Sequence, residues 1–89
     1  MKKTYFPSNA VLENAIIEAL KTLGGTATVP EINKTLIEQL QLPTEIVEME
    51  DESGLGTKLD YRLRWCRTNL KTKGKIKNVT RGTWELISE

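Results

Sequence analysis

The fold is decided by residues 57–88, which read TKLDYRLRWCRTNLKTKGKIKNVTRGTWELIS. Apolar side chains in the first half recur four, three and four positions apart, as they do along one face of an α-helix: Leu59, Leu63, Cys66 and Leu70. This periodicity predicts a helix from about residue 57 to residue 73. Gly74 ends it, because glycine adopts the left-handed conformation at low cost.

The second half of this stretch predicts a β-hairpin over residues 75–88. Two extended runs, Lys75–Val79 and Thr83–Ser88, flank the turn residues Thr80–Gly82. Gly82 supplies the positive φ that a tight hairpin needs. We expect three apolar side chains of the hairpin to face the core: Ile76, Trp84 and Leu86.

A first helix is predicted near the amino terminus, over about residues 9–23. Its apolar residues form a stripe at three- and four-residue spacing: Val11, Leu12, Ala15, Ile16, Ala19, Leu20 and Leu23. Ser8 or Asn9 can cap its start, since either side chain accepts from free backbone amides. Gly24 and Gly25 end it.

A second helix is predicted over about residues 30–40. Pro30 stands in its first turn, where proline is tolerated, and one face is apolar: Ile32, Leu36, Ile37 and Leu40. The residues before it, Thr26–Val29, are largely β-branched and can form a short strand.

Residues 42–56 are expected to connect the second and third helices, with a short helical turn after Pro43. This connection is acidic, with Glu45, Glu48, Glu50, Asp51 and Glu52 in eight residues that hold no base. We retain three interpretations of it: a solvated loop, a contact for a basic partner protein, or a screen that weakens anion binding by the third helix.

The order helix, short strand, helix, helix, hairpin is that of a winged helix-turn-helix, a mainly α member of the α+β class. The chain of 89 residues is long enough for a single domain spanning residues 1–89. The connection between the second and third helices is longer than the turn of three or four residues in a strict helix-turn-helix, which counts against a standard recognition geometry.

Charge is distributed unevenly although the net charge is only +1. Residues 1–60 carry five basic and ten acidic side chains, whereas residues 61–89 carry eight basic and two acidic ones. This asymmetry favours a polyanion-facing surface at the carboxyl-terminal end.

Several function classes are disfavoured by composition. The chain has no histidine and one cysteine, so the commonest general base and metal ligand is missing and an internal disulfide is excluded. We find no catalytic triad, metal-ligand cluster or glycine-rich phosphate loop. We therefore expect no enzyme activity, no cofactor, no metal and no membrane association, and a cytoplasmic location.

The carboxyl-terminal residues resemble those of a known family, the amino-terminal domain of Mrr-type restriction endonucleases. The resemblance rests on an Arg–Trp pair in the third helix, its Leu-Lys-x-x-Gly end, and an Arg-Gly-x-Trp motif: Arg62, Trp65, Leu70, Lys71, Gly74, Arg81, Gly82, Trp84 and Ile87. Cys66 and Ser88 depart from the family pattern. The resemblance implies a DNA-recognising winged helix without catalysis, since cleavage belongs to a nuclease domain that this sequence does not contain, and it makes modified DNA a candidate target.

We therefore predict that the protein binds double-stranded DNA. In the third helix the predicted contacts are Lys58, Tyr61, Arg64, Arg67, Thr68 and Lys71, and in the wing they are Lys75, Lys77 and Arg81. Lysines would neutralise phosphates. Arg64 is the candidate for a guanine edge in the major groove, and Arg81 suits a narrow minor groove.

Other interpretations remain open. The domain can serve a restriction-type nuclease, fused or as a separate subunit, or act as a stand-alone transcriptional regulator. It can instead bind a protein or form a homodimer through Trp65 and the acidic connection. We expect Trp65 to pack under the wing or a loop, Cys66 to be an inert buried thiol, and Arg62 either to contact DNA or to pair with Glu31 or Glu38.

Overall fold

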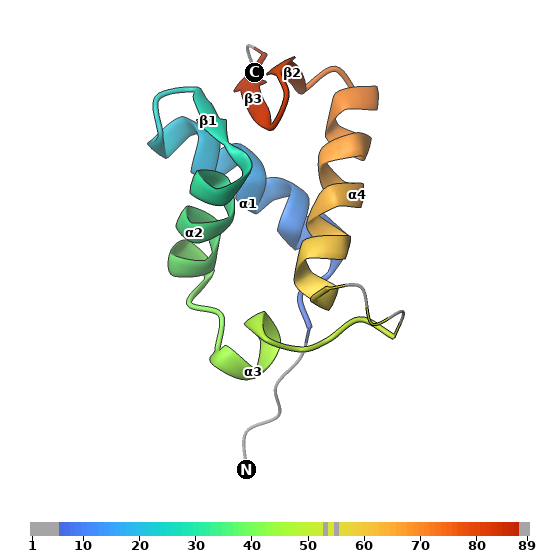
Figure 1. The fold of residues 1–89 in the computed structure, drawn as a ribbon. Helices are drawn as coiled ribbons and strands as arrows, with labels where there is room; N and C mark the ends of the chain where they lie inside the picture. Colours follow the sequence, from blue (N-terminus) through green and yellow to red (C-terminus); the bar gives the residue numbers. More distant parts are fainter. Residues whose placement is uncertain (1–5, 53, 55, 88–89) are drawn as a thin grey trace.

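In the computed structural model, which describes residues 6–52, 54 and 56–87, helices surround a small core and a sheet closes one end (Figure 1). The elements follow the chain in this order: α1 (Asn9–Thr22), β1 (Thr26–Thr28), α2 (Val29–Leu40), α3 (Thr44–Val47), α4 (Lys58–Thr72), β2 (Ile76–Thr80) and β3 (Thr83–Leu86). The predicted winged-helix class is confirmed. The short α3 is the helical turn expected after Pro43.

Side-chain caps define where the helices begin. Ser8 caps α1 by accepting from the amide of Val11 at 3.2 Å. At α2, Thr28 and Glu31 form a capping box, in which the hydroxyl accepts from the Glu31 amide and the carboxylate accepts from the Thr28 amide at 2.9 Å. These bonds satisfy amides that have no partner inside the helix.

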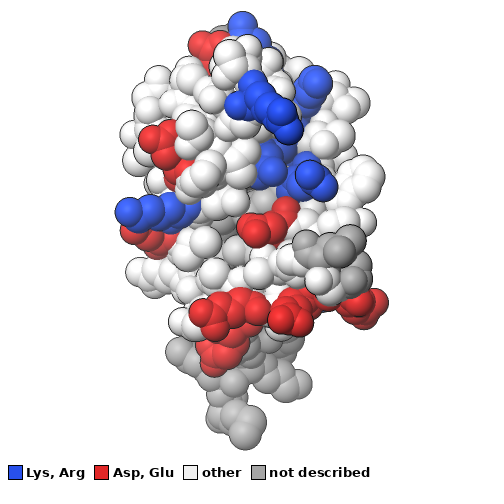
Figure 2. All heavy atoms as spheres, viewed as in Figure 1, with Lys and Arg blue, Asp and Glu red and all other residues white. Residues whose placement is uncertain are grey.

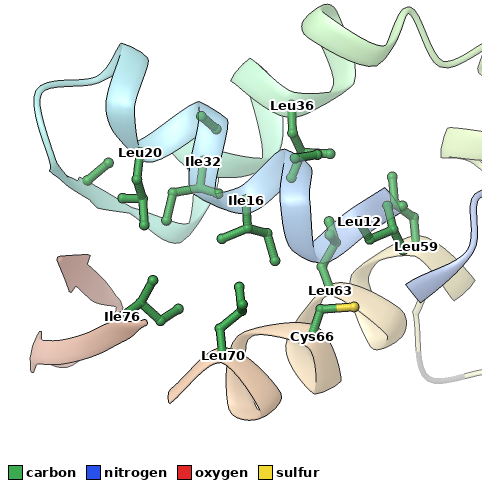
Figure 3. Packing of buried hydrophobic residues seen from close by; sticks show 13 residues of the cluster. Leu12, Ile16, Leu20, Ile32, Leu36, Leu59, Leu63, Cys66, Leu70 and Ile76 are labelled. Carbon is green, nitrogen blue, oxygen red and sulfur yellow. The ribbon is translucent and has the colours of Figure 1, made fainter. Parts of the chain in front are cut away.

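The core lies where α1, α2 and α4 meet (Figure 3). The four residues of the predicted α4 stripe, Leu59, Leu63, Cys66 and Leu70, are all buried. They pack with the buried residues of the other elements: Leu12, Ala15, Ile16, Ala19, Leu20, Ala27, Ile32, Leu36 and Ile76. The predicted apolar stripe of α1 is wrong at one position, because Val11 is exposed at the edge of the helix.

The hairpin joins a sheet of three antiparallel strands in the order β1-β3-β2. The β2–β3 turn is closed by Arg81 and Gly82, between the paired residues Thr80 and Thr83, and Gly82 has the predicted positive φ, 77°. The β1 strand pairs with β3 through Ala27 and Trp84. Ile76 is buried as expected, whereas Trp84 and Leu86 are only partly buried against the core.

Candidate nucleic-acid interface

The outward face of α4 carries exposed polar and basic side chains. Tyr61, Arg64, Thr68 and Lys71 are all exposed, on the side of the helix opposite the leucines. The hydroxyl of Thr68 donates to the backbone oxygen of Arg64 at 3.2 Å, so its proton is engaged within the helix while its oxygen can still accept. This face presents two cations and an aromatic ring to solvent.

Two other cations of α4 contact the amino-terminal segment. Lys58 and Arg62 lie over the ring of Phe6, with the charged groups 5.1 and 5.2 Å from its centroid. Arg62 also donates to the side-chain oxygen of Asn9 at 3.3 Å. The bracing partners of Arg62 are therefore Phe6 and Asn9, and neither expected glutamate pairs with it in the described part of the chain. Lys58 is only half-exposed as a result.

Arg67 lies apart from the exposed face. It lines a groove together with residues of α2, and it is 9% exposed, the only buried charged residue among those described. Burial lowers the pKa of its guanidinium from the ordinary 12.5, the charge of Arg64 lowers it further, and Asp60 opposes both effects. The group still carries its charge at neutral pH, since an arginine titrates far above that range.

The hairpin and the residue before it add further cations next to the carboxyl-terminal end of α4. Lys75 and Arg81 are exposed. Lys77 pairs with Glu85 of the neighbouring strand at 3.4 Å, so part of its charge is compensated within the sheet. The backbone oxygen of Gly82 accepts from the Val29 amide at 3.0 Å, which holds the turn and its arginine beside the start of α2.

The predicted placement of Trp65 in the core is wrong. The residue is 51% exposed and meets the half-exposed Tyr61 edge to face, with ring centroids 6.3 Å apart. The helix directs Trp65 away from the leucine face, and the described residues of the hairpin and of the connection before α4 leave it half-exposed. The two residues form an exposed aromatic pair. Cys66, beside them in sequence, is buried as predicted, and burial raises the pKa of its thiol.

The acidic connection lies at the opposite end of α4 from the hairpin. The backbone oxygen of Met49 accepts from the Lys58 amide at 2.8 Å, and Glu50 pairs with Thr57 in an isolated bridge. Figure 2 shows a band of acidic side chains over α3 and the segment after it, while basic side chains gather over α4 and the hairpin. Glu45, Glu48 and Glu52 are exposed, so the solvated-loop interpretation fits most of this segment.

Asp51 is the exception, because it lines a groove between α2 and α4 together with Asp60, Arg64 and Arg67. This is the placement that the screening interpretation requires, and that interpretation stays a prediction. The same groove includes Asn33, a residue that sequence reasoning missed. In the sequence, Asn33 follows Ile32 and so lies at the edge of the apolar face of α2. This position could have marked it as partly buried, but the spacing does not show which other element lies opposite that edge.

Metal and membrane sites find no support in the part of the chain that the structure describes. No group of three or more Cys, Asp or Glu residues there is arranged to hold a metal ion. No helix among residues 6–52 and 56–87 has both the length and the apolar character to cross a bilayer.

Comparison with known proteins supports the resemblance drawn from the sequence. A family model described as the Mrr N-terminal domain matches residues 11–89, from the first turns of α1 to the end of the chain. The match is to an amino-terminal domain and not to a nuclease domain, and it associates the chain with a restriction-system protein. No curated protein and no solved structure matches at the threshold applied.

Proposed function

We propose that this chain, which belongs to the Mrr N-terminal domain family, binds double-stranded DNA as the recognition module of a restriction-type system. Catalysis would reside elsewhere in that system, since the family match is to an amino-terminal domain and not to a nuclease domain. The α4 helix would enter the major groove and the hairpin would lie along the backbone or in the minor groove, as in other winged helices.

The observation that carries the proposal is the concentration of exposed cations over α4 and the hairpin, away from the acidic band (Figure 2). Arg64, Lys71, Lys75 and Arg81 are exposed, and we call these four residues the basic surface. Such a surface displaces condensed counterions from phosphates, which gives affinity that falls as salt rises.

The predicted contacts divide into groups according to their surroundings. Arg64 is suited to a guanine edge, because its guanidinium can donate two hydrogen bonds in one plane. Lys71, Lys75 and Arg81 would contact phosphates or the minor groove, as would Lys77 after it releases Glu85. Tyr61 and Thr68 would add polar contacts. Lys58 and Arg67 would contribute less at the surface, because the first is held over Phe6 and the second is buried.

A second function is favoured by a different observation. The exposed Tyr61–Trp65 pair offers apolar area beside a polar rim, and aromatic residues are enriched at protein interfaces. A protein partner or a second copy of the chain would then dock on Trp65, with the acidic connection nearby. Such binding would depend on Trp65 and would tolerate the loss of Arg64 and Arg81.

The test is a fluorescence-anisotropy titration of a labelled random-sequence duplex at several salt concentrations. We expect the wild type to bind with a dissociation constant of roughly 10⁻⁴–10⁻⁶ M near physiological salt, and more tightly below it. Arg64→Ala combined with Arg81→Ala should weaken binding. If both arginines contact phosphates, the slope of log affinity against log salt should become shallower by about 1.8, at about 0.9 per contact.

The matched control is Lys21→Ala combined with Lys34→Ala, which also removes two positive charges, one from α1 and one from α2. This variant should keep a salt slope close to that of the wild type. An equal loss of affinity in both double variants would mean that the net charge of the protein governs DNA binding and that the basic surface has no special role. Absence of duplex binding by the wild type at low salt would reject the proposal and favour a protein partner.

A further inference from the structure

A groove separates the amino-terminal half of α2 from α4. One wall is formed by Val29, Pro30 and Asn33 of α2, and the other by residues of α4, including Tyr61 and Arg67. Its volume is about 660 Å³, within the range of small-ligand clefts, about 300–1,000 Å³. The hairpin turn is held beside the start of α2 by the bond from Val29 to Gly82, so the groove opens next to the turn that carries Arg81.

Two buried polar atoms in this groove lack a hydrogen-bond partner among the described residues. They are Nη1 of Arg67 and Oδ1 of Asn33, and both residues line the groove. Arg67 is 91% buried, since 9% of it is exposed. Buried polar groups are almost always hydrogen-bonded, and a buried donor left unpaired is unfavourable. Both atoms have almost no accessible surface, so a rotation of the two side chains would bring this unpaired donor and this unpaired acceptor to a ligand that has both an acceptor and a donor.

Charge in the groove favours a neutral ligand over a phosphate. Arg64 and Arg67 contribute two positive charges, and Asp51 and Asp60 contribute two negative ones. An anion would be attracted by the arginines and repelled by the aspartates. A neutral group that accepts from Arg67 and donates to Asn33 meets no such opposition.

The walls favour a flat ligand. Tyr61 of α4 and Pro30 of α2 both line the groove, so it offers one aromatic and one apolar ring to a planar group. Aromatic side chains bind nucleobases by stacking, and the contact does not depend on the base because every base has a π-face. Nucleobases also carry adjacent acceptor and donor atoms along one edge.

We propose that this groove receives a single nucleobase turned out of the DNA stack, with Arg67 donating to its edge and Asn33 accepting from it. The inference rests on the proposed DNA binding and adds to it a site that shares only Arg64 with the basic surface. Lys71, Lys75 and Arg81 would hold the backbone beside the groove, while the base itself would leave the duplex. Unpaired or mismatched bases would enter most readily, because less pairing and stacking is lost.

The experiment compares three labelled duplexes of the same flanking sequence under the same salt conditions. One is fully paired, one carries a single bulged nucleotide, and one carries an abasic nucleotide at the bulge. The two bulges bend and loosen the duplex in similar ways and differ in whether a base is present. We expect the wild type to bind the base-bearing bulge roughly tenfold or more tightly than the abasic one, the gain of a hydrogen bond to a charged group.

Two variants assign that preference to the groove. Asn33→Ala and Arg67→Met should each reduce it to about twofold or less, and Asn33→Ala should do so while binding to the paired duplex persists. Lys34→Ala, which changes the residue after Asn33, should keep the full preference. Circular dichroism of each variant establishes that it is folded, so that loss of preference is not loss of structure.

The outcomes separate this inference from the proposed function. Salt-dependent binding of the paired duplex with equal affinity for both bulges would overturn the base pocket and leave DNA binding intact. A base preference that survives in both groove variants would also overturn it, and would place the base on another surface, such as Trp65. No binding of any duplex at low salt would overturn both proposals.

Discussion

Replacing the buried arginine should make the folded protein more stable. Arg67 is 91% buried, with 9% of it exposed, and its Nη1 has no hydrogen-bond partner among the described residues. Arg67→Met removes the guanidinium but keeps an unbranched apolar stem, so the packing of that stem is largely retained.

The expected size follows from the cost of a buried, unpaired donor. Such a group disfavours folding by about 1–3 kcal/mol, and by more when it is charged. Asp60 lies close enough to act on the pKa of Arg67, but it is exposed, so its attraction offsets only about 0–1 kcal/mol of that cost. We expect Arg67→Met to raise the unfolding free energy by about 1–2 kcal/mol. For a domain of this size, each kcal/mol corresponds to about 4–8 °C in Tm.

The assay is urea unfolding followed by circular dichroism, with thermal unfolding as a second measure. Arg64→Met is the matched control, since it makes the same chemical change at an exposed position of the same helix. It should alter the unfolding free energy by less than about 0.5 kcal/mol.

One result would refute the reasoning. If Arg67→Met lowers the unfolding free energy by 1 kcal/mol or more while Arg64→Met leaves it unchanged, the guanidinium is already satisfied in the free protein, for example by ordered water. The groove would then have no unmet donor to offer a base. A gain in stability together with loss of base-dependent binding would instead mark a site kept for function at the expense of stability.

Thr28→Ala removes the hydroxyl that caps α2 and should lower the unfolding free energy by about 1 kcal/mol in urea, whereas Thr28→Ser should stay close to the wild type. Bonds with Thr28 lower the pKa of Glu31 below its ordinary 4.5, so the folded state favours the carboxylate. That contribution is fully present above the ordinary value and is lost as pH falls through the lower folded pKa, and Glu31→Gln should remove this part of the acid dependence. Burial raises the pKa of Cys66 above 9.0, so iodoacetamide at pH 8 should label it only after unfolding; rapid labelling of the native protein would contradict its burial. Trp65→Ala should change the unfolding free energy by less than about 0.5 kcal/mol, and Trp84→Ala should lower it by about 1–3 kcal/mol, so equal effects would contradict the observed exposure of Trp65.

Local signals in the sequence determined the elements and their ends. The spacing of Leu59, Leu63, Cys66 and Leu70 identified the buried face of α4, because helical periodicity relates residues within a few turns of one another. Gly74 and Gly82 marked the end of α4 and the hairpin turn, and both have positive φ, at 78° and 77°. These features depend on backbone sterics and near neighbours alone, which is why sequence reasoning found them.

Long-range packing decided the rest. Arg64 and Arg67 are one helical turn apart and chemically identical, yet only Arg67 is buried, in the groove that α4 forms with α2. Asn33 joins the same groove from a helix more than thirty residues earlier. Trp65 remains exposed because no other described element extends over its side of α4. Periodicity determines which side chains share a face, but the element that covers the edge of that face is set by contacts between distant segments, which a single sequence does not encode in its local spacing.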